Sequence, residues 1–276
     1  MIRGCFFTTL LLLLCSSSLL AQLETEDALP LLPGQVELGA GLEYQTSKEG
    51  REVALPVSLE YGLSKKFTLL IEPVGFTTIH PKTGRHVTGI GDLEMTLFYQ
   101  LKSESATFPA ISVSAEIKLP TARDSLIGTG KTDFTPFVIA SKTTGKFFTS
   151  VNASYTFLGK PAGISVNNLF NYAVGTIFQA SDKSIFFAEV YGNTSALGGK
   201  DVPENTVTLP SNPSKTSEIS GGEKVISAGY GYYVTKNLQL SLSISYDNNH
   251  AVLFRPGIIW TSQEGRNFFR HAPAAR

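Results

Sequence analysis

The chain has 276 residues, of which 42% are hydrophobic and 17% are charged. Its 23 Lys and Arg residues balance its 23 Asp and Glu residues, so neither a nucleic-acid-binding surface nor an anionic-lipid-binding surface is expected. The length allows two small domains or one all-β barrel or sandwich.

The first 21 residues have the pattern of a secretory signal peptide. Arg3 supplies a positive charge, residues 6–15 an apolar stretch and residues 16–21 a small-residue exit, so cleavage is expected after Ala21. The alternative is a retained helical anchor. We disfavour it because the apolar stretch is short and has no charged flank on its far side.

The rest of the chain is expected to form one barrel with two short extensions. Residues 22–33 are predicted to be an N-terminal periplasmic segment, residues 34–261 the barrel, and residues 262–276 a C-terminal tail. Both cysteines, Cys5 and Cys15, lie in the signal peptide. The mature chain is therefore expected to have no disulfide and no thiolate site.

From residue 34 onward, apolar and polar residues alternate with a period of two, which is typical of strands with one apolar face. In residues 237–247, the even positions from 238 to 246 hold Leu, Ile or Tyr, and the odd positions between them hold Gln or Ser. About twelve such segments occur, an even number, as closed bacterial barrels require. The predicted strands are residues 34–46, 52–63, 67–76, 89–101, 111–119, 133–141, 147–157, 168–179, 184–192, 224–234, 237–247 and 251–261. The sixth, eighth, ninth and tenth carry apolar residues on both faces, so the alternation does not assign which of their faces points inward.

The connections between these strands alternate in length. Those after even-numbered strands are mostly short, such as residues 64–66, whereas most of those after odd-numbered strands are longer, such as residues 77–88, 120–132 and 193–222. Short periplasmic turns and longer external loops are expected of an outer-membrane barrel. The sequence therefore predicts an all-β, closed, antiparallel transmembrane barrel of about twelve strands, in the outer membrane of a Gram-negative bacterium.

If the apolar faces meet lipid, the polar faces send charges into the lumen, since an Arg or Lys at the bilayer midplane would cost about 2–4 kcal/mol. An acid-rich lumen would favour cations over anions or bind polar solute groups. Alternatively, the carboxylates pair with bases and fill a narrow barrel. The expected lumen-facing residues are Glu37, Glu43, Glu60, Glu72, Asp92, Glu94, Glu116, Lys118 and Arg255.

One motif suggests nucleotide binding, but its surroundings do not support that interpretation. Residues 128–132 (GTGKT) resemble the end of a phosphate-binding P-loop, whose first glycine position is occupied here by Ser125. A strand-like segment containing Pro136 follows in place of the helix that would bind phosphate.

The histidines do not form a recognisable catalytic or metal-binding pattern. His80 and His86 share one predicted loop, and neither their spacing nor that of His250 and His271 matches a zinc template. Solvated loop histidines are the expected interpretation. The His-Ser pattern of outer-membrane phospholipases does not occur either, so we predict no enzymatic activity, no cofactor and no metal site.

Three motifs on successive strands read G-x-G-D, K-L-P-T and G-x-G-x-x-D. Together with the aromatic-rich strand at residues 147–157, they resemble the outer-membrane family associated with the meta-pathway of phenol degradation. The similar residues cover about a quarter of the chain. They are Gly89, Gly91 and Asp92; Lys118, Leu119, Pro120 and Thr121; and Gly128, Gly130 and Asp133.

The resemblance implies an outer-membrane barrel that passes small hydrophobic or aromatic solutes, but it supplies no functional residues. The glycines also have a structural interpretation, because they permit tight turns and strand curvature at barrel rims. Barrels often end on an aromatic strand, whereas this chain continues for 16 residues after Trp260. Trp260 or Phe269 is the expected signal for the outer-membrane assembly machinery.

The leading functional hypothesis is a passive outer-membrane channel, with membrane lipid and a small solute as partners and an oligomeric state left open. A non-conducting structural or adhesive barrel, acting through residues 193–222, is the first alternative. A soluble exported β-sandwich is the second.

Overall fold

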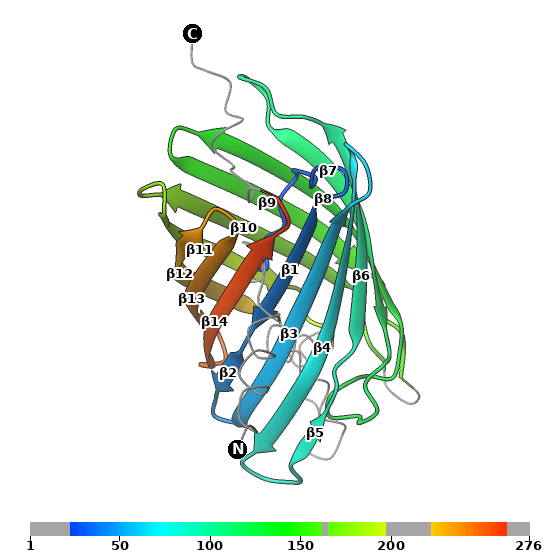
Figure 1. The fold of residues 1–276 in the computed structure, drawn as a ribbon. Helices are drawn as coiled ribbons and strands as arrows, with labels where there is room; N and C mark the ends of the chain where they lie inside the picture. The colour runs from blue at the N-terminus through cyan, green and yellow to red at the C-terminus, as the bar shows by residue number, and fades with distance from the viewer. Residues whose placement is uncertain (1–22, 162–164, 197–221, 264–276) are drawn as a thin grey trace, which may run out of the picture.

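The computed structural model describes residues 23–161, 165–196 and 222–263. These residues form a single sheet of fourteen strand segments, in which every neighbouring pair is antiparallel and β1 pairs with β14 to close a barrel (Figure 1). No helix in the described ranges is long and apolar enough to cross a membrane. The strands are β1 (Val36–Gly41), β2 (Glu43–Thr46), β3 (Gly50–Gly62), β4 (Phe67–Pro81), β5 (Val87–Gly89), β6 (Leu93–Lys102), β7 (Ala110–Leu119), β8 (Asp133–Thr144), β9 (Phe147–Thr156), β10 (Leu169–Gln179), β11 (Ser184–Asn193), β12 (Lys224–Thr235), β13 (Leu238–Asp247) and β14 (Val252–Thr261).

The twelve predicted strands are confirmed, and two of them are interrupted. The first predicted strand is divided into β1 and β2 at Leu42, whose backbone N–H still donates a hydrogen bond to the Pro256 carbonyl at 3.0 Å. The fourth, residues 89–101, begins at the last residue of β5, is interrupted at residues 90–92 and continues as β6. The predicted loop at residues 77–88 is largely a hairpin, because β4 continues to Pro81 and pairs with β5.

The barrel has apolar residues outside and polar residues inside. Val138 and Ile244 on the outer face are each 56% exposed, whereas the inward Thr68 and Ser141 are each 1% exposed. This polarity is that of a transmembrane barrel. It excludes the exported sandwich, whose apolar faces would pack against each other.

The two ends of the barrel differ in their connections. β1 begins and β14 ends at the end that also carries the short turns, such as residues 145–146 between β8 and β9. We call this the short-turn end, which is uppermost in Figure 1. The hairpin of β4 and β5 projects from the opposite, long-loop end.

Residues 23–33, which we call the plug segment, run through the barrel lumen as far as Leu31 and end at the exposed Leu32 and Pro33. This corrects the predicted periplasmic position of residues 22–33, of which residue 22 lies outside the described ranges. Leu23 and Leu29 pack on an inward apolar cluster that includes Ile177 and Phe187. Ala28 packs in a second cluster, which includes Ile139.

The plug segment explains why some of the predicted strands carry apolar residues on both faces. Ile139 on β8, Ile177 on β10 and Phe187 on β11 point inward and are buried, while Val138 and Phe186 beside them point outward. Their outer faces meet lipid and their inner faces contact the plug segment or its supporting cluster. Both faces are apolar because both meet apolar surroundings.

Several predictions from the sequence concern residues outside the described ranges. The signal peptide, the greater part of the connection at residues 193–222, and the tail from residue 264 with Phe269 are among them. Trp260 is described and lies in β14, where it pairs with Leu38 and Leu238. Its role in assembly stays a prediction.

The outward face should not tolerate charge near the middle of a strand. Val151→Arg, at the centre of β9 on a side chain that is 47% exposed, should lower the free energy of unfolding by about 2–4 kcal/mol. Thr144→Arg at the exposed end of β8 should lower it by only about 0–1 kcal/mol. Urea unfolding in lipid vesicles measures both, and equal effects would contradict the membrane position.

Candidate functional site

The plug segment is held at the short-turn end by inward side chains from four strands. The Ala28 N–H donates to Ser141 Oγ at 2.8 Å, and the Ala28 carbonyl accepts from Gln100 Nε2 at 3.0 Å and Ser112 Oγ at 2.8 Å. The Leu31 N–H donates to Thr68 Oγ1 at 3.0 Å. The barrel wall therefore supplies hydrogen-bond partners to plug backbone that has no strand neighbour.

Deeper in the lumen, the plug segment runs along β9, β10 and β11. Glu26 exchanges two backbone hydrogen bonds with the Asn152 amide, at 2.6 and 2.8 Å. Glu189 accepts the N–H of Thr25 at 3.1 Å and its hydroxyl at 2.9 Å. Gly175 permits this approach, because a Cβ at that position would lie 2.9 Å from Thr25 Cβ.

Arg255 joins the plug segment to the wall. Its guanidinium lies 3.1 Å from the Glu24 carboxylate and 2.7 Å from that of Glu43. The Arg255 side chain is only 5% exposed, so its charge is stabilised mainly by these carboxylates. The predicted lumen residues Glu43 and Arg255 are thus partners across β2 and β14.

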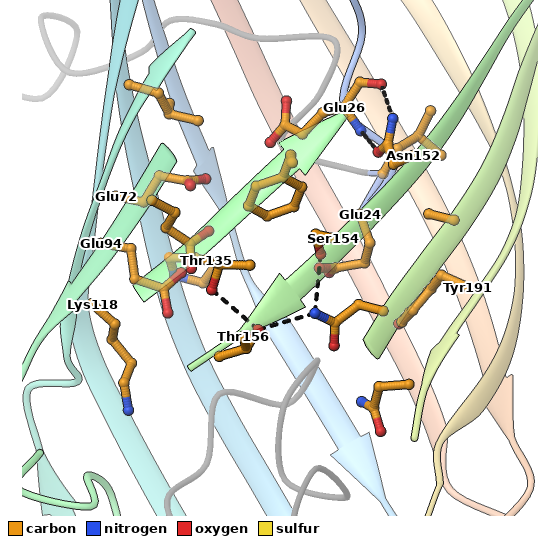
Figure 2. Close-up of a pocket in the computed structure, with 18 of the residues that line it drawn as sticks. Glu24, Glu26, Glu72, Glu94, Lys118, Thr135, Asn152, Ser154, Thr156 and Tyr191 are labelled. Atoms are coloured by element: carbon orange, nitrogen blue, oxygen red, sulfur yellow. Dashed lines mark hydrogen bonds between the residues drawn. The ribbon is translucent and has the colours of Figure 1, made fainter. Parts of the chain in front are cut away.

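A cavity of about 220 Å³ lies between the plug segment and the long-loop end (Figure 2). A second, much smaller pocket of about 10 Å³ lies beside the plug segment, between Pro30 and Thr68, and has roughly the room that one water molecule needs. Because it bonds to side chains of β4, β6, β7 and β8, the plug segment occupies the lumen at the short-turn end.

The cavity is strongly acidic. Glu72 and Glu94 lie opposite each other on β4 and β6, and they face an uncharged wall that includes Asn152 and Ser154 (Figure 2). Nine carboxylate residues and two basic residues line the cavity. They are Glu24, Glu26, Glu43, Glu60, Glu72, Glu94, Glu116, Asp133 and Glu223, with Lys118 and Arg255.

Seven of the nine predicted lumen residues line this cavity, and the other two lie elsewhere. Glu37 on β1 is 1% exposed and lies opposite Glu60 in the register of β1 with β3. Asp92 lies in the break between β5 and β6. The sequence missed Glu24 and Glu26, because the plug segment has no strand periodicity. The sequence also did not predict the uncharged side of the cavity, because Ser and Asn occur on the polar face of any strand and do not by themselves indicate a cavity.

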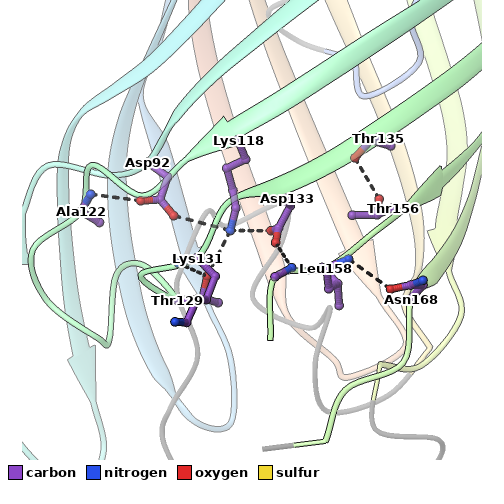
Figure 3. Close-up of polar contacts among 11 residues, drawn as sticks. Asp92, Lys118, Ala122, Thr129, Lys131, Asp133, Thr135, Thr156, Leu158 and Asn168 are labelled. Atoms are coloured by element: carbon purple, nitrogen blue, oxygen red, sulfur yellow. Dashed lines mark hydrogen bonds and ion pairs between the residues drawn. The ribbon is translucent and has the colours of Figure 1, made fainter. Parts of the chain in front are cut away.

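The three family-like motifs meet in one cluster at the long-loop end (Figure 3). Lys118 Nζ lies 2.6 Å from Asp133 Oδ2, 3.6 Å from Asp92 Oδ2 and 3.3 Å from Thr129 Oγ1. Asp92 accepts the Ala122 N–H at 3.0 Å, and Asp133 accepts a backbone N–H from residue 159 at 2.7 Å. One lysine therefore links three separate connections.

The glycines of the motifs allow this cluster to form. A Cβ on Gly128 would lie 2.5 Å from Ala122 Cβ, one on Gly91 would lie 2.5 Å from Val74 Cβ, and one on Gly89 would lie 3.0 Å from the Ile127 side chain. Gly130 has a φ of 65°, which favours glycine. Thr121, after the Pro120 that ends β7, donates from its hydroxyl to the Gly91 carbonyl at 2.9 Å. The motifs therefore have a structural role.

Comparisons with solved structures find the same fold. An outer-membrane channel from Pseudomonas putida F1 is 11% identical with a TM-score of 0.62, covering 86% of this chain and 99% of that one. The NanC porin is 10% identical with a TM-score of 0.55, covering 81% and 98%. The KdgM porin in complex with oligogalacturonate is 9% identical with a TM-score of 0.50, covering 82% and 98%.

These likenesses show that the chain has the barrel fold of outer-membrane channels and porins. No protein-family model matches the sequence, and no curated protein matches it. The resemblance to the phenol-degradation family therefore stays a prediction.

Loss of the central lysine should destabilise the barrel. The Lys118 side chain is 11% exposed, so Lys118→Met would leave two mostly buried carboxylates and should lower the free energy of unfolding by about 3–5 kcal/mol. Adding Asp92→Asn and Asp133→Asn should recover part of this loss. Lys131→Met, on an exposed lysine of the same connection, is the control for urea unfolding and should change little.

Proposed function

We propose that the protein is an outer-membrane channel for small cationic solutes, with the plug segment controlling its short-turn end. The observation that carries this proposal is the acidic cavity, in which nine carboxylate residues face two basic ones. Lumen walls of low dielectric strengthen the field of such an excess and concentrate counter-ions. Small ammonium or metal cations fit this field, whereas anions are repelled.

The acidic wall disfavours two other classes of solute, polyanions and hydrophobic or aromatic compounds. The KdgM structure contains oligogalacturonate, a polyanion, whose charge is opposite to that favoured by this cavity. Hydrophobic or aromatic solutes, which the family resemblance implies, would have to displace water from carboxylates without replacing its hydrogen bonds. A cationic or strongly polar solute is therefore the better match.

The proposed orientation places the short-turn end in the periplasm and the long loops outside the cell. The acidic cavity then lies on the external side of the plug segment, and the signal peptide directs export. A solute would enter from the long-loop end and stop at residues 23–33.

Passage requires the plug segment to move, and its contacts allow this. Most of its polar contacts are hydrogen bonds between plug backbone and wall side chains, each contributing about 0.5–1.5 kcal/mol. Water in the lumen can replace them one at a time. The two apolar clusters and the Glu24–Arg255 ion pair give the closed position its additional stability.

A non-conducting barrel is the second candidate, because the plug segment bonds to side chains of four strands at the short-turn end. In that case the plug segment would be a permanent part of the core. The two functions differ in whether the barrel conducts after the plug has been removed.

Removing the plug should open the channel. The full mature chain should give small or intermittent conductance in planar bilayers, and deletion of residues 23–31 should raise it several-fold. Heat-modifiable gel mobility checks that the deletion variant still forms a barrel. A folded deletion variant that stays silent would overturn the channel and favour the non-conducting barrel.

A reversible cross-link provides a second test of plug movement. Ala28→Cys and Ser141→Cys place two thiols on neighbouring residues, since the Ala28 backbone N–H lies 2.8 Å from Ser141 Oγ. The oxidised protein should conduct less than the reduced protein, because the disulfide holds the plug in place. Equal conductance in both forms would show that plug movement does not control the pore.

The acidic wall should determine ion preference. Glu72→Gln, Glu94→Gln and Glu116→Gln together should lower the cation-over-anion permeability ratio in the plug-deleted channel several-fold, because three cavity carboxylates lose their charge. The control changes Glu49→Gln and Asp182→Asn, two carboxylates that are exposed in turns outside the cavity. Reversal potentials in a salt gradient measure the ratio. A ratio equally affected by the control would mean that the cavity does not select ions.

A further inference from the structure

The hairpin of β4 and β5 brings two histidines together at the long-loop end. Thr78 pairs with Thr88 and Ile79 with Val87, so the next opposite position pairs His80 with His86. The two Nδ1 atoms are 3.1 Å apart, and the ring centroids are 4.4 Å apart. Both side chains are exposed. The two rings therefore lie edge to face, with an interplanar angle of 60°, at a surface open to solvent.

We propose that His80 and His86 form a chelating site for a divalent transition-metal ion, with Cu²⁺ and Zn²⁺ the preferred ions. Imidazole nitrogen is a common ligand of both metals, and copper binds most tightly in this series. Metal–nitrogen bonds of about 2.0–2.1 Å at tetrahedral or square-planar angles place two nitrogens roughly 2.9–3.4 Å apart. The observed Nδ1–Nδ1 distance of 3.1 Å lies in that range.

A neighbouring hydroxyl orients the His80 ring. The Thr78 hydroxyl lies 3.3 Å from His80 Nε2, which leaves Nδ1 facing His86. Hydrogen bonding of the second ring nitrogen is the usual way in which proteins orient a histidine ligand. The Thr78 hydroxyl also contacts that of Thr88 at 2.8 Å, across the hairpin.

A bidentate ion pair fixes the hairpin beside His86. Both terminal nitrogens of Arg85 lie 2.7 Å from the Asp124 carboxylate. The hydrogen bonds from Arg85 lower the pKa of Asp124, so the pair stays charged at neutral pH. The hairpin is thereby joined to the connection between β7 and β8.

The site has two protein ligands. Among the described residues, no group of three or more His, Cys, Asp or Glu side chains is placed to hold a metal. Water or a small molecule that carries the metal would therefore occupy the remaining coordination positions. Such an exposed, open site fits reversible capture of a metal ion at the outer mouth of the barrel.

The test is metal titration of the full mature protein in detergent. Isothermal titration calorimetry with Cu²⁺ and with Zn²⁺ should show one ion per chain, and the electron paramagnetic resonance spectrum of the Cu²⁺ form should show two coordinating nitrogens. His80→Ala and His86→Ala should each weaken binding by more than the roughly 10–100-fold that loss of an outer partner costs. Thr78→Val should weaken it less.

Two histidine variants serve as controls. His250→Ala removes an exposed histidine that contacts Tyr246 in another connection, and His271→Ala removes one in the C-terminal tail. Neither should change metal affinity. Unchanged affinity in His80→Ala and His86→Ala, or loss of binding in either control, would overturn the site. Heat-modifiable mobility of each variant shows that the barrel is intact.

Discussion

The structure depends on the pairing of β1 with β14, which closes the sheet. In the hydrocarbon region of a membrane no water is available to unpaired backbone groups, so a spanning sheet cannot keep a free edge. Closure fixes which face of each strand meets lipid and which meets the lumen. The exposed apolar surface and the buried Glu, Ser and Thr side chains both follow from this one constraint.

Polar groups that point into the lumen need hydrogen-bond partners, and the plug segment supplies some of them. At the short-turn end, Ser112 and Ser141 bond the plug backbone in place of a neighbouring strand. Toward the long-loop end, the lumen is not filled, and the carboxylates of β3, β4, β6 and β7 line a cavity instead. Arg255 lies at the boundary and binds acids of both the plug and the wall.

The long-loop end combines rigid and accessible parts. Lys118 links the connections around Asp92, Thr129 and Asp133, and the Arg85–Asp124 pair extends this support to the β4–β5 hairpin. The motifs that gave the family resemblance therefore shape the long-loop end of the barrel. The groups available to solutes and ions, the cavity acids and the paired histidines, are supported by that frame.

The sequence by itself determined the twelve strands, the lipid face of the regular ones and seven of the cavity residues. These properties are local, since alternation within one strand fixes the face on which each side chain lies. The plug segment, the inward faces of β8, β10, β11 and β12, the Lys118 cluster and the His80–His86 pair were decided only by the tertiary structure. Each depends on contacts between residues far apart in sequence or on the register of two strands. Glu189, for example, binds Thr25, and no spacing pattern links those positions until the barrel has closed around the plug.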